Sequence, residues 1–138
     1  MSKKEIPSMD EWLKEAKKDP QADQCGMYLV HNGVVRIKAK AVVRDLIPEE
    51  EKEAMKEVAA VDFSYDEEKV GAAIREAYQM PGIYYVKVWL NEGVLQVGED
   101  IMFVMIGGDI RPRVVDALQA LVGTIKNTCV IEREIYVS

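Results

Sequence analysis

Four basic side chains bracket one apolar stretch near the C-terminal end of this chain of 138 residues. Arg111 and Arg113 precede the stretch, Lys126 closes it, and Arg133 follows seven positions later. Guanidinium groups bind phosphate and carboxylate through paired hydrogen bonds, and the free N–H groups at a helix start also attract anions. The spacing therefore predicts an anion site. A structural turn with solvated arginines is the alternative.

A buried strand and an amphipathic helix must position these cations. Residues 101–106 are six consecutive apolar residues between glycine-containing turns, which is typical of a strand buried on both faces. Asp109 can cap a following helix with Pro112 in its first turn. The apolar positions of that helix recur with helical spacing: Val114, Val115, Leu118, Leu121, Val122 and Ile125. A final strand is predicted over 129–137.

The N-terminal half contributes helices of two kinds. Ser8 and Glu11 form a capping box before a short amphipathic helix, so residues 1–25 are predicted to be a helix followed by a loop. Residues 45–60 are rich in glutamate and poor in apolar side chains, which indicates a solvated helix. We expect an acidic helical segment there.

The segments between these helices predict a sheet. Strands are expected over 58–63, 83–90 and 94–97, and a capping box of Ser64 and Glu67 predicts a helix that ends before Pro81-Gly82. Asn32-Gly33 separates an apolar run from an alternating run, and therefore predicts a hairpin with a second strand over 34–43. The irregular order of helices and strands indicates a single α+β domain, residues 1–138, with a largely antiparallel sheet and packed helices.

Composition excludes several classes of protein. With 49% apolar residues, no membrane-spanning run and no apolar leader, we expect a soluble cytoplasmic protein without membrane contact. A net charge of −6 argues against nucleic-acid binding. The two cysteines lack metal-type spacing and His31 is the only histidine, so we expect no metal and no cofactor, and interpret His31 as an ordinary strand or turn residue.

The C-terminal half resembles the large, catalytic subunit of molybdopterin synthase, the MoaE family. Shared features are Gly98-Glu99, the apolar strand, a basic residue at the turn, an apolar helix ending in lysine, and a second basic residue seven positions later. In a register without gaps, Arg111 falls on the arginine of the family's His-Arg pair, Lys126 on its first active-site lysine and Arg133 on its second.

Two positions depart from the family pattern. Ile110 stands where the family has histidine, and Arg133 where it has the second lysine. If one residue is deleted, Glu132 rather than Arg133 takes that second position, which would reverse the sign of the charge there.

The resemblance also gives residues 27–36 a second interpretation. The spacing of Gly26 and Gly33-Val34-Val35-Arg36 matches the first strand of the family, with a bulge at Gly33 and Arg36 as the pocket arginine. A weaker register uses Arg44 instead. The family usually has a shorter connection where this chain has residues 45–60, so the resemblance implies that this acidic helical segment is an insertion. In a fold of this type we expect Arg36, Arg111, Lys126 and Arg133 to meet at one end of the sheet, where crowded cations lower the pKa of Lys126.

The family's reaction implies roles for these residues. In molybdenum cofactor biosynthesis it transfers sulfur to a cyclic pyranopterin monophosphate from a small ubiquitin-like partner, which carries a thiocarboxylate on its C-terminal Gly-Gly. The resemblance implies that Lys126 is the reactive amine and that arginines hold the substrate anion: Arg36, Arg111 and Arg133. Arg113 is a further anion-binding candidate because it lies at the predicted helix start. It also implies a homodimer, which unpaired strand edges favour independently. A dimeric binding module that has lost turnover, but keeps an anion or partner-tail groove, is the alternative.

Overall fold

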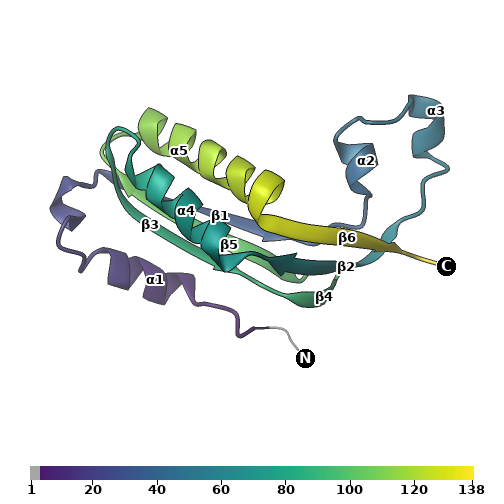
Figure 1. Ribbon diagram of the computed structural model, residues 1–138, viewed down its shortest axis with the longest axis horizontal. Coiled ribbons are helices and arrows are strands. Elements are labelled where there is room, and N and C mark those ends of the chain that lie inside the picture. The colour runs from purple at the N-terminus through teal and green to yellow at the C-terminus, as the bar shows by residue number, and fades with distance from the viewer. Residues whose placement is uncertain (1–3) are drawn as a thin grey trace.

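Two antiparallel sheets of three strands and five α-helices make up the protein over residues 4–138, which the structure, a computed structural model, describes (Figure 1). Both sheets have a long central strand. The first contains, in order, β1 (Met27–Val34), β5 (Asp100–Gly108) and β3 (Ile83–Leu90). The second contains β4 (Gly93–Gln96), β2 (Val58–Tyr65) and β6 (Val130–Tyr136). The predicted α+β class is confirmed.

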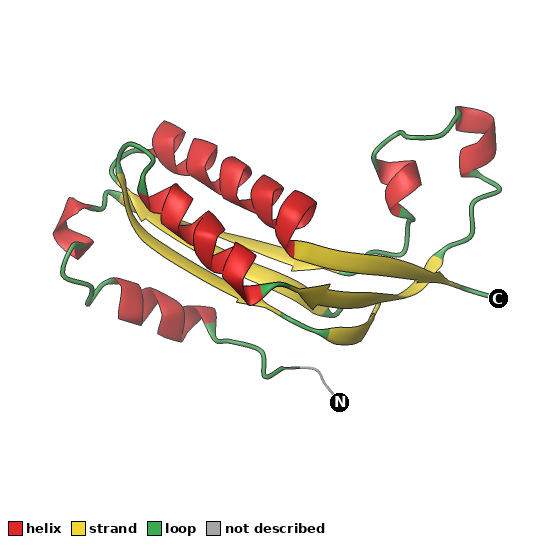
Figure 2. Cartoon of the chain, in the orientation of Figure 1, coloured by secondary structure: helices red, strands yellow, loops and turns green. Residues whose placement is uncertain are grey.

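The helices cover both faces of the first sheet. α4 (Glu67–Tyr78) and α5 (Arg111–Thr124) lie side by side on one face, and α1 (Met9–Ala16) lies against the other (Figure 2). The short helices α2 (Lys40–Val43) and α3 (Glu49–Lys52) lie beyond the end of this layered core, beside the second sheet. The connection between β1 and β2 therefore stands apart from the main helices.

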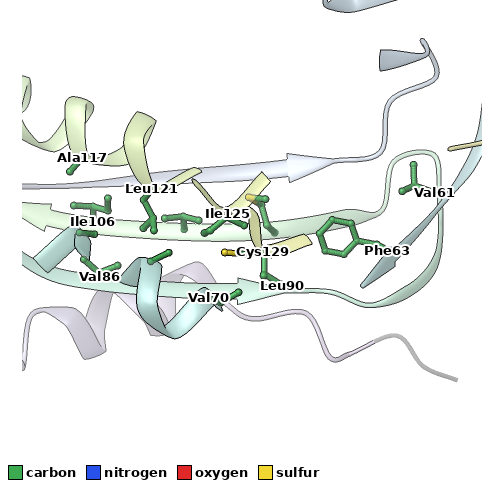
Figure 3. Close-up of a cluster of buried hydrophobic side chains, with 14 of the residues drawn as sticks. Val61, Phe63, Val70, Val86, Leu90, Ile106, Ala117, Leu121, Ile125 and Cys129 are labelled. Atoms are coloured by element: carbon green, nitrogen blue, oxygen red, sulfur yellow. The ribbon is translucent and has the colours of Figure 1, made fainter. Parts of the chain in front are cut away.

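β5 is buried on both faces, as its apolar sequence predicts. Met102, Val104 and Ile106 belong to the core under α4 and α5, whereas Phe103 and Met105 pack with α1. Figure 3 shows Ile106 in one cluster with Ala117, Leu121 and Ile125 of the helix layer. Each such side chain contributes about 1.5–3 kcal/mol on full burial. The strand is therefore the centre around which both layers assemble.

The hairpin predicted at Asn32-Gly33 is wrong, and the single strand with a bulge is confirmed. Residues on both sides of Gly33 pair with β5, and the register shifts between Gly33 and Val34. The Asn32 side chain donates to the carboxylate of Asp100 at 3.0 Å and to the carbonyl of Met102 at 3.2 Å, which ties it to β5 rather than to a turn. Residues 35–39 are irregular and lead into α2 instead of a second strand.

Two helix caps also differ from the prediction. Ile110, not Asp109, occupies the N-cap of α5, and the Asp109 carboxylate accepts from the Ile110 N–H at 2.7 Å. Asp66, not Ser64, caps α4 by accepting from the N–H groups of Glu68 and Lys69. β2 continues to Tyr65, so Ser64 remains in the ladder opposite Ile131. At α1 the Ser8 cap is confirmed by its bond from the Glu11 N–H at 3.3 Å.

The acidic segment 45–60 is only partly helical. α3 spans four residues, and β2 begins at Val58. α3 begins with three successive glutamates. Lys52 forms ion pairs with the carboxylates of Asp45 and Glu49. With few apolar side chains to bury, propensity alone does not extend so short a helix. That the segment is an insertion stays a prediction.

Glycine at the end of β5 allows α5 to turn back closely onto the sheet. A Cβ at Gly108 would lie 2.6 Å from the Gly82 carbonyl oxygen and 2.7 Å from a Val114 methyl carbon. We expect Gly108→Ala to lower the free energy of unfolding by about 1–3 kcal/mol because the site is already filled. Gly123→Ala is the matched control, because open space surrounds that helical position. It should raise the free energy of unfolding by about 0.5–1 kcal/mol. Urea denaturation measures both changes, and a neutral Gly108→Ala would contradict the close packing.

Candidate functional site

Lys126 lies on a π-helical turn, Ile125–Cys129, that joins α5 to β6. Ile125 and Cys129 are buried and fix the two ends of the turn in the core (Figure 3). Thr128 donates its hydroxyl to the Thr124 carbonyl at 2.7 Å across the widened turn. Lys126 is thereby held partly buried at the C-terminal end of α5. Single π turns within helices are frequent at functional sites.

A small pocket surrounds Lys126, and four other segments line it. Arg36 follows the end of β1, Lys40 begins α2, β2 contributes one apolar side chain, and β6 contributes two carboxylates. The pocket residues are Arg36, Lys40, Val61, Lys126, Glu132 and Glu134. The segment before Arg36 is anchored, because Val35 donates to the Glu99 carbonyl at 3.0 Å and accepts from the Gly98 N–H at 2.8 Å.

The carboxylates of β6 attach α2 to this pocket. The Lys40 ammonium is paired with Glu132, and the Lys40 backbone N–H donates to the Glu134 carboxylate at 2.8 Å. Ala39 at the N-cap offers no side-chain acceptor, so Glu134 supplies one from another element. Lys40 was not among the residues identified from sequence, because the strand predicted over 34–43 gave it no defined neighbours.

Burial and neighbouring charge act on Lys126 together. Burial lowers its pKa, the Glu132 carboxylate opposes that effect, and the cations of Arg44, Lys40 and Arg36 lower the pKa further. The predicted lowering is thus found, with burial as its main cause. Arg36 and Arg44, which the sequence left as alternatives for one pocket arginine, both act on this amine. Four cations against two carboxylates leave the site positively charged.

His31 is a site neighbour that the sequence analysis did not identify. It pairs with Val104 in the β1–β5 ladder and so faces the helix layer, on the side of the sheet that carries Lys126. Burial lowers its pKa, and the Lys126 charge lowers it as well. The alternation of Leu29, His31 and Gly33 along one strand would have placed it on this face, but the predicted hairpin obscured that pattern.

Arg111 and Arg113 lie at the opposite end of α5 from Lys126. Fifteen residues of helix at about 1.5 Å each separate Arg111 from Lys126 by about 22 Å. Arg113 is paired with Asp109 at 2.8 Å, and both arginines are exposed beside the β5–α5 turn. The expectation that the four cations meet at one end of the sheet is therefore wrong within a single protomer, because the helix axis keeps its two ends apart.

Arg133 also points away from the pocket. Its side chain is 70% exposed and lies 3.5 Å from the Asp62 carboxylate, with which it is also paired in the β2–β6 register. Alternation along β6 places Glu132 on the pocket face and Arg133 on the other. Arg133 shares its face with Ile131 and Ile135 as expected, but that face is not the one beside Lys126.

Two kinds of feature are not found among the described residues. Over 4–138, no group of three or more His, Cys, Asp or Glu side chains could hold a metal ion. Within the same residues no helix has both the length and the apolar character needed to cross a membrane. The groups at or near Lys126 are guanidinium groups, a second ammonium, carboxylates and the imidazole of His31.

Comparisons with known proteins identify relatives of this fold. The family model described as MoaE protein matches residues 3–128, and no curated protein matches the sequence significantly. Molybdopterin synthase from Staphylococcus aureus has a TM-score of 0.69 at 17% identity, covering 96% of this chain and 88% of its own. For the MoaE protein from Burkholderia ambifaria MC40-6 the TM-score is 0.66 at 16% identity, and the match covers 96% of this chain and 84% of that protein. For a chain in a complex of subunits 1 and 2 of molybdopterin-converting factor from Helicobacter pylori 26695 the TM-score is 0.61 at 15% identity. That match covers 96% of this chain and 85% of the other.

The charges around Lys126 predict opposite effects of two substitutions on its pKa. Glu132→Gln should lower the pKa of Lys126, because it removes the attraction that opposes burial, and Arg44→Gln should raise it by removing a repulsion. Competitive acylation at a series of pH values, read by mass spectrometry, measures the midpoint. Asp62→Asn, on the opposite face of the second sheet, is the control. Midpoints that stay unchanged in both variants would contradict this electrostatic arrangement.

Proposed function

Because the chain belongs to the MoaE protein family, we propose that it acts in molybdenum cofactor biosynthesis as the large subunit of a molybdopterin synthase. The region matched by the family model contains both Lys126 and Arg36. The observation that carries the proposal is a partly buried amine with a lowered pKa among several cations, at the end of the central helix. The likeness to solved molybdopterin synthases supports the fold in which this amine stands.

The proposed reaction transfers sulfur from a thiocarboxylated partner to a cyclic pyranopterin monophosphate. Both reactants are anionic, and a positively charged pocket attracts both. Arg36 offers a guanidinium to the phosphate or pterin oxygens, since it lines the pocket without an ion-pair partner of its own among the interactions of residues 4–138. Lys126 is placed to act on the thiocarboxylate as acid, base or nucleophile.

A small sulfur-carrier subunit is the proposed partner. The Helicobacter pylori neighbour is a complex of two subunits of a molybdopterin-converting factor, which supports a two-subunit assembly for this fold. We infer that the partner presents an extended C-terminal Gly-Gly tail, because glycine without side chains can enter a pocket as narrow as the one beside Lys126.

The remaining predicted site residues require a second copy of the chain. Arg111, Arg113 and Arg133 are too far from Lys126, or on the wrong face, to join it within one protomer. In the proposed homodimer such an arginine can approach the partner's pocket instead. The second sheet offers an apolar surface for this contact, because Ile131 is 75% and Val94 45% exposed.

A binding module without turnover is the second candidate. It is favoured by the carboxylate of Glu132, which occupies the strand position beside Lys126 and is paired with Lys40. Ile110, at the position where the family carries histidine, has no titratable group and is 53% exposed. Under this alternative the fold and the tail-binding pocket remain, but sulfur transfer does not occur.

Substitution of Lys126 tests the proposed reaction. With a thiocarboxylated small subunit and the pyranopterin substrate, wild-type protein should form the dithiolene product and Lys126→Ala should form none, while unfolding remains cooperative. Arg36→Ala should weaken phosphate binding by about 1.5–3 kcal/mol, the range for a charged hydrogen bond. Arg75→Ala, on an exposed turn of α4, is the control for both. If the wild type gives no product, the binding module is the better description.

Mixed dimers test the contribution of Arg111 across an interface. Light scattering should give about twice the chain mass of 15.6 kDa. Lys126→Ala and Arg111→Ala protomers should each be inactive or weak alone, yet co-expression should restore about a quarter of wild-type activity, because one arrangement joins the intact lysine to the intact arginine. A monomer, or mixtures that stay inactive, would exclude a shared site.

A further inference from the structure

An ammonium group of the chain itself is bound at one edge of the first sheet. Nζ of Lys4 donates to the Tyr65 hydroxyl at 2.6 Å and to the Leu90 carbonyl at 2.7 Å. The same atom lies 5.0 Å from the ring centroid of Tyr65 and 5.7 Å from that of Trp89. Aromatic faces attract cations that lie within about 6 Å of the centroid. We call these two rings, with the Tyr65 hydroxyl and the Leu90 carbonyl, the ammonium cup.

The groups of the ammonium cup belong to the two sheets. Tyr65 is the last residue of β2 and pairs with β6. Trp89 packs against the core cluster beneath α1. β3 is an edge strand, and Asn91 donates its N–H to a carbonyl of β5 at 2.8 Å, so the Leu90 carbonyl before it faces the outer edge. Strand pairing, rather than Lys4, therefore sets the positions of these electron-rich groups.

A second contact binds the backbone of the lysine. The Lys4 N–H donates to Oδ1 of Asn91 at 3.1 Å. Asn91 is fully buried, and its side chain is fixed because it donates to the Asp100 carbonyl at 2.9 Å and accepts from the Glu92 N–H at 2.9 Å. Lys4 itself lies outside any helix or strand. The site thus binds a lysine residue at two points, its ammonium group and its backbone N–H.

Charge and space at the ammonium cup favour a cation that can be exchanged. A hollow of about 350 Å³ lies beside Lys4, and Glu67, in the acidic first turn of α4, lines it. The side chains of Glu5 and Ile6 are exposed, and within the described chain the hydrogen bonds shown for residues 4–7 are all made by Lys4. A segment held by so few contacts opens at a low cost in free energy.

We propose that the ammonium cup binds a lysine in an extended, basic segment of a partner protein, and that Lys4 is the internal occupant which this lysine displaces. A primary ammonium fits the cup better than a fully methylated one, because oxygen atoms accept two of its N–H groups. The net charge of −6 also favours a basic partner. The cup shares no residue with the Lys126 pocket, so this site does not depend on the proposed function.

Titration of the full chain, followed by the ¹H–¹⁵N signal of the Trp89 indole, tests the ammonium cup. Lys4→Ala should bind the peptide acetyl-Gly-Lys-Gly-amide saturably, and should bind n-butylammonium more weakly because that amine lacks the backbone N–H. Wild-type protein should bind the peptide about tenfold more weakly than Lys4→Ala does, because Lys4 competes for the same groups. The same peptide with norleucine in place of lysine keeps the alkyl chain without the charge, and should not bind.

Removal of one acceptor separates the cup from general electrostatic attraction. In the Lys4→Ala background, Tyr65→Phe keeps the ring but loses the hydroxyl, and should weaken peptide binding by about tenfold or more. Tyr84→Phe, at the start of β3, is the matched control and should leave the affinity unchanged. The proposal is overturned by a lack of saturable binding to Lys4→Ala, by equal binding of the norleucine peptide, or by an unchanged affinity in Tyr65→Phe. Binding of n-butylammonium as tight as that of the peptide would assign the cup to a free amine instead. A lower mass of Lys4→Ala than of wild type in light scattering would make a second copy of the chain the occupant.

Discussion

The burial of β5 on both faces is the constraint on which the rest of this structure depends. A strand with apolar side chains on both faces must have one layer of structure above it and another below. Here α4 and α5 cover one face and α1 the other, while β1 and β3 satisfy its two edges. The chain leaves β5 through glycines that allow a close turn, so α5 must run back along the strand. This return carries Lys126 about 22 Å along the sheet from Arg111.

The same constraint explains why the site combines burial with charge. The last turn of α5 must bury Ile125 and Cys129 in the core, and Lys126 between them is drawn partly out of water. An ammonium in that position costs free energy unless a counter-charge or a ligand compensates it. Glu132 compensates in part, and Arg36, Lys40 and Arg44 act in the other direction. The balance of charges favours an anion in the pocket, and burial together with the neighbouring cations lowers the pKa of the amine.

Prediction from the sequence succeeded where an apolar pattern was long, and it failed where strand pairing determined the local structure. The six apolar residues of β5 and the stripe along α5 are periodic signals that few alternative structures satisfy. Asn32-Gly33 is a strong local turn signal, yet both of its flanks pair with β5, so tertiary pairing overrides it. The inward-facing position of His31 depends on that pairing. The separation of Arg111 from Lys126 followed from helix length alone, and the expectation of one shared site overlooked it.

The face occupied by Arg133 shows most clearly what a sequence cannot specify. Because side chains alternate along a strand, a shift of one residue in the start of β6 would exchange Glu132 and Arg133 between pocket and solvent. That start is set by the π-helical turn, which accommodates one more residue than an α-helical turn before the chain enters the ladder opposite Tyr65. One local irregularity therefore fixes both where Lys126 stands and which sign of charge faces it. No periodicity in residues 125–133 indicates a π-helical turn. Its two buried residues, Ile125 and Cys129, are four positions apart and so also fit a regular α-helix.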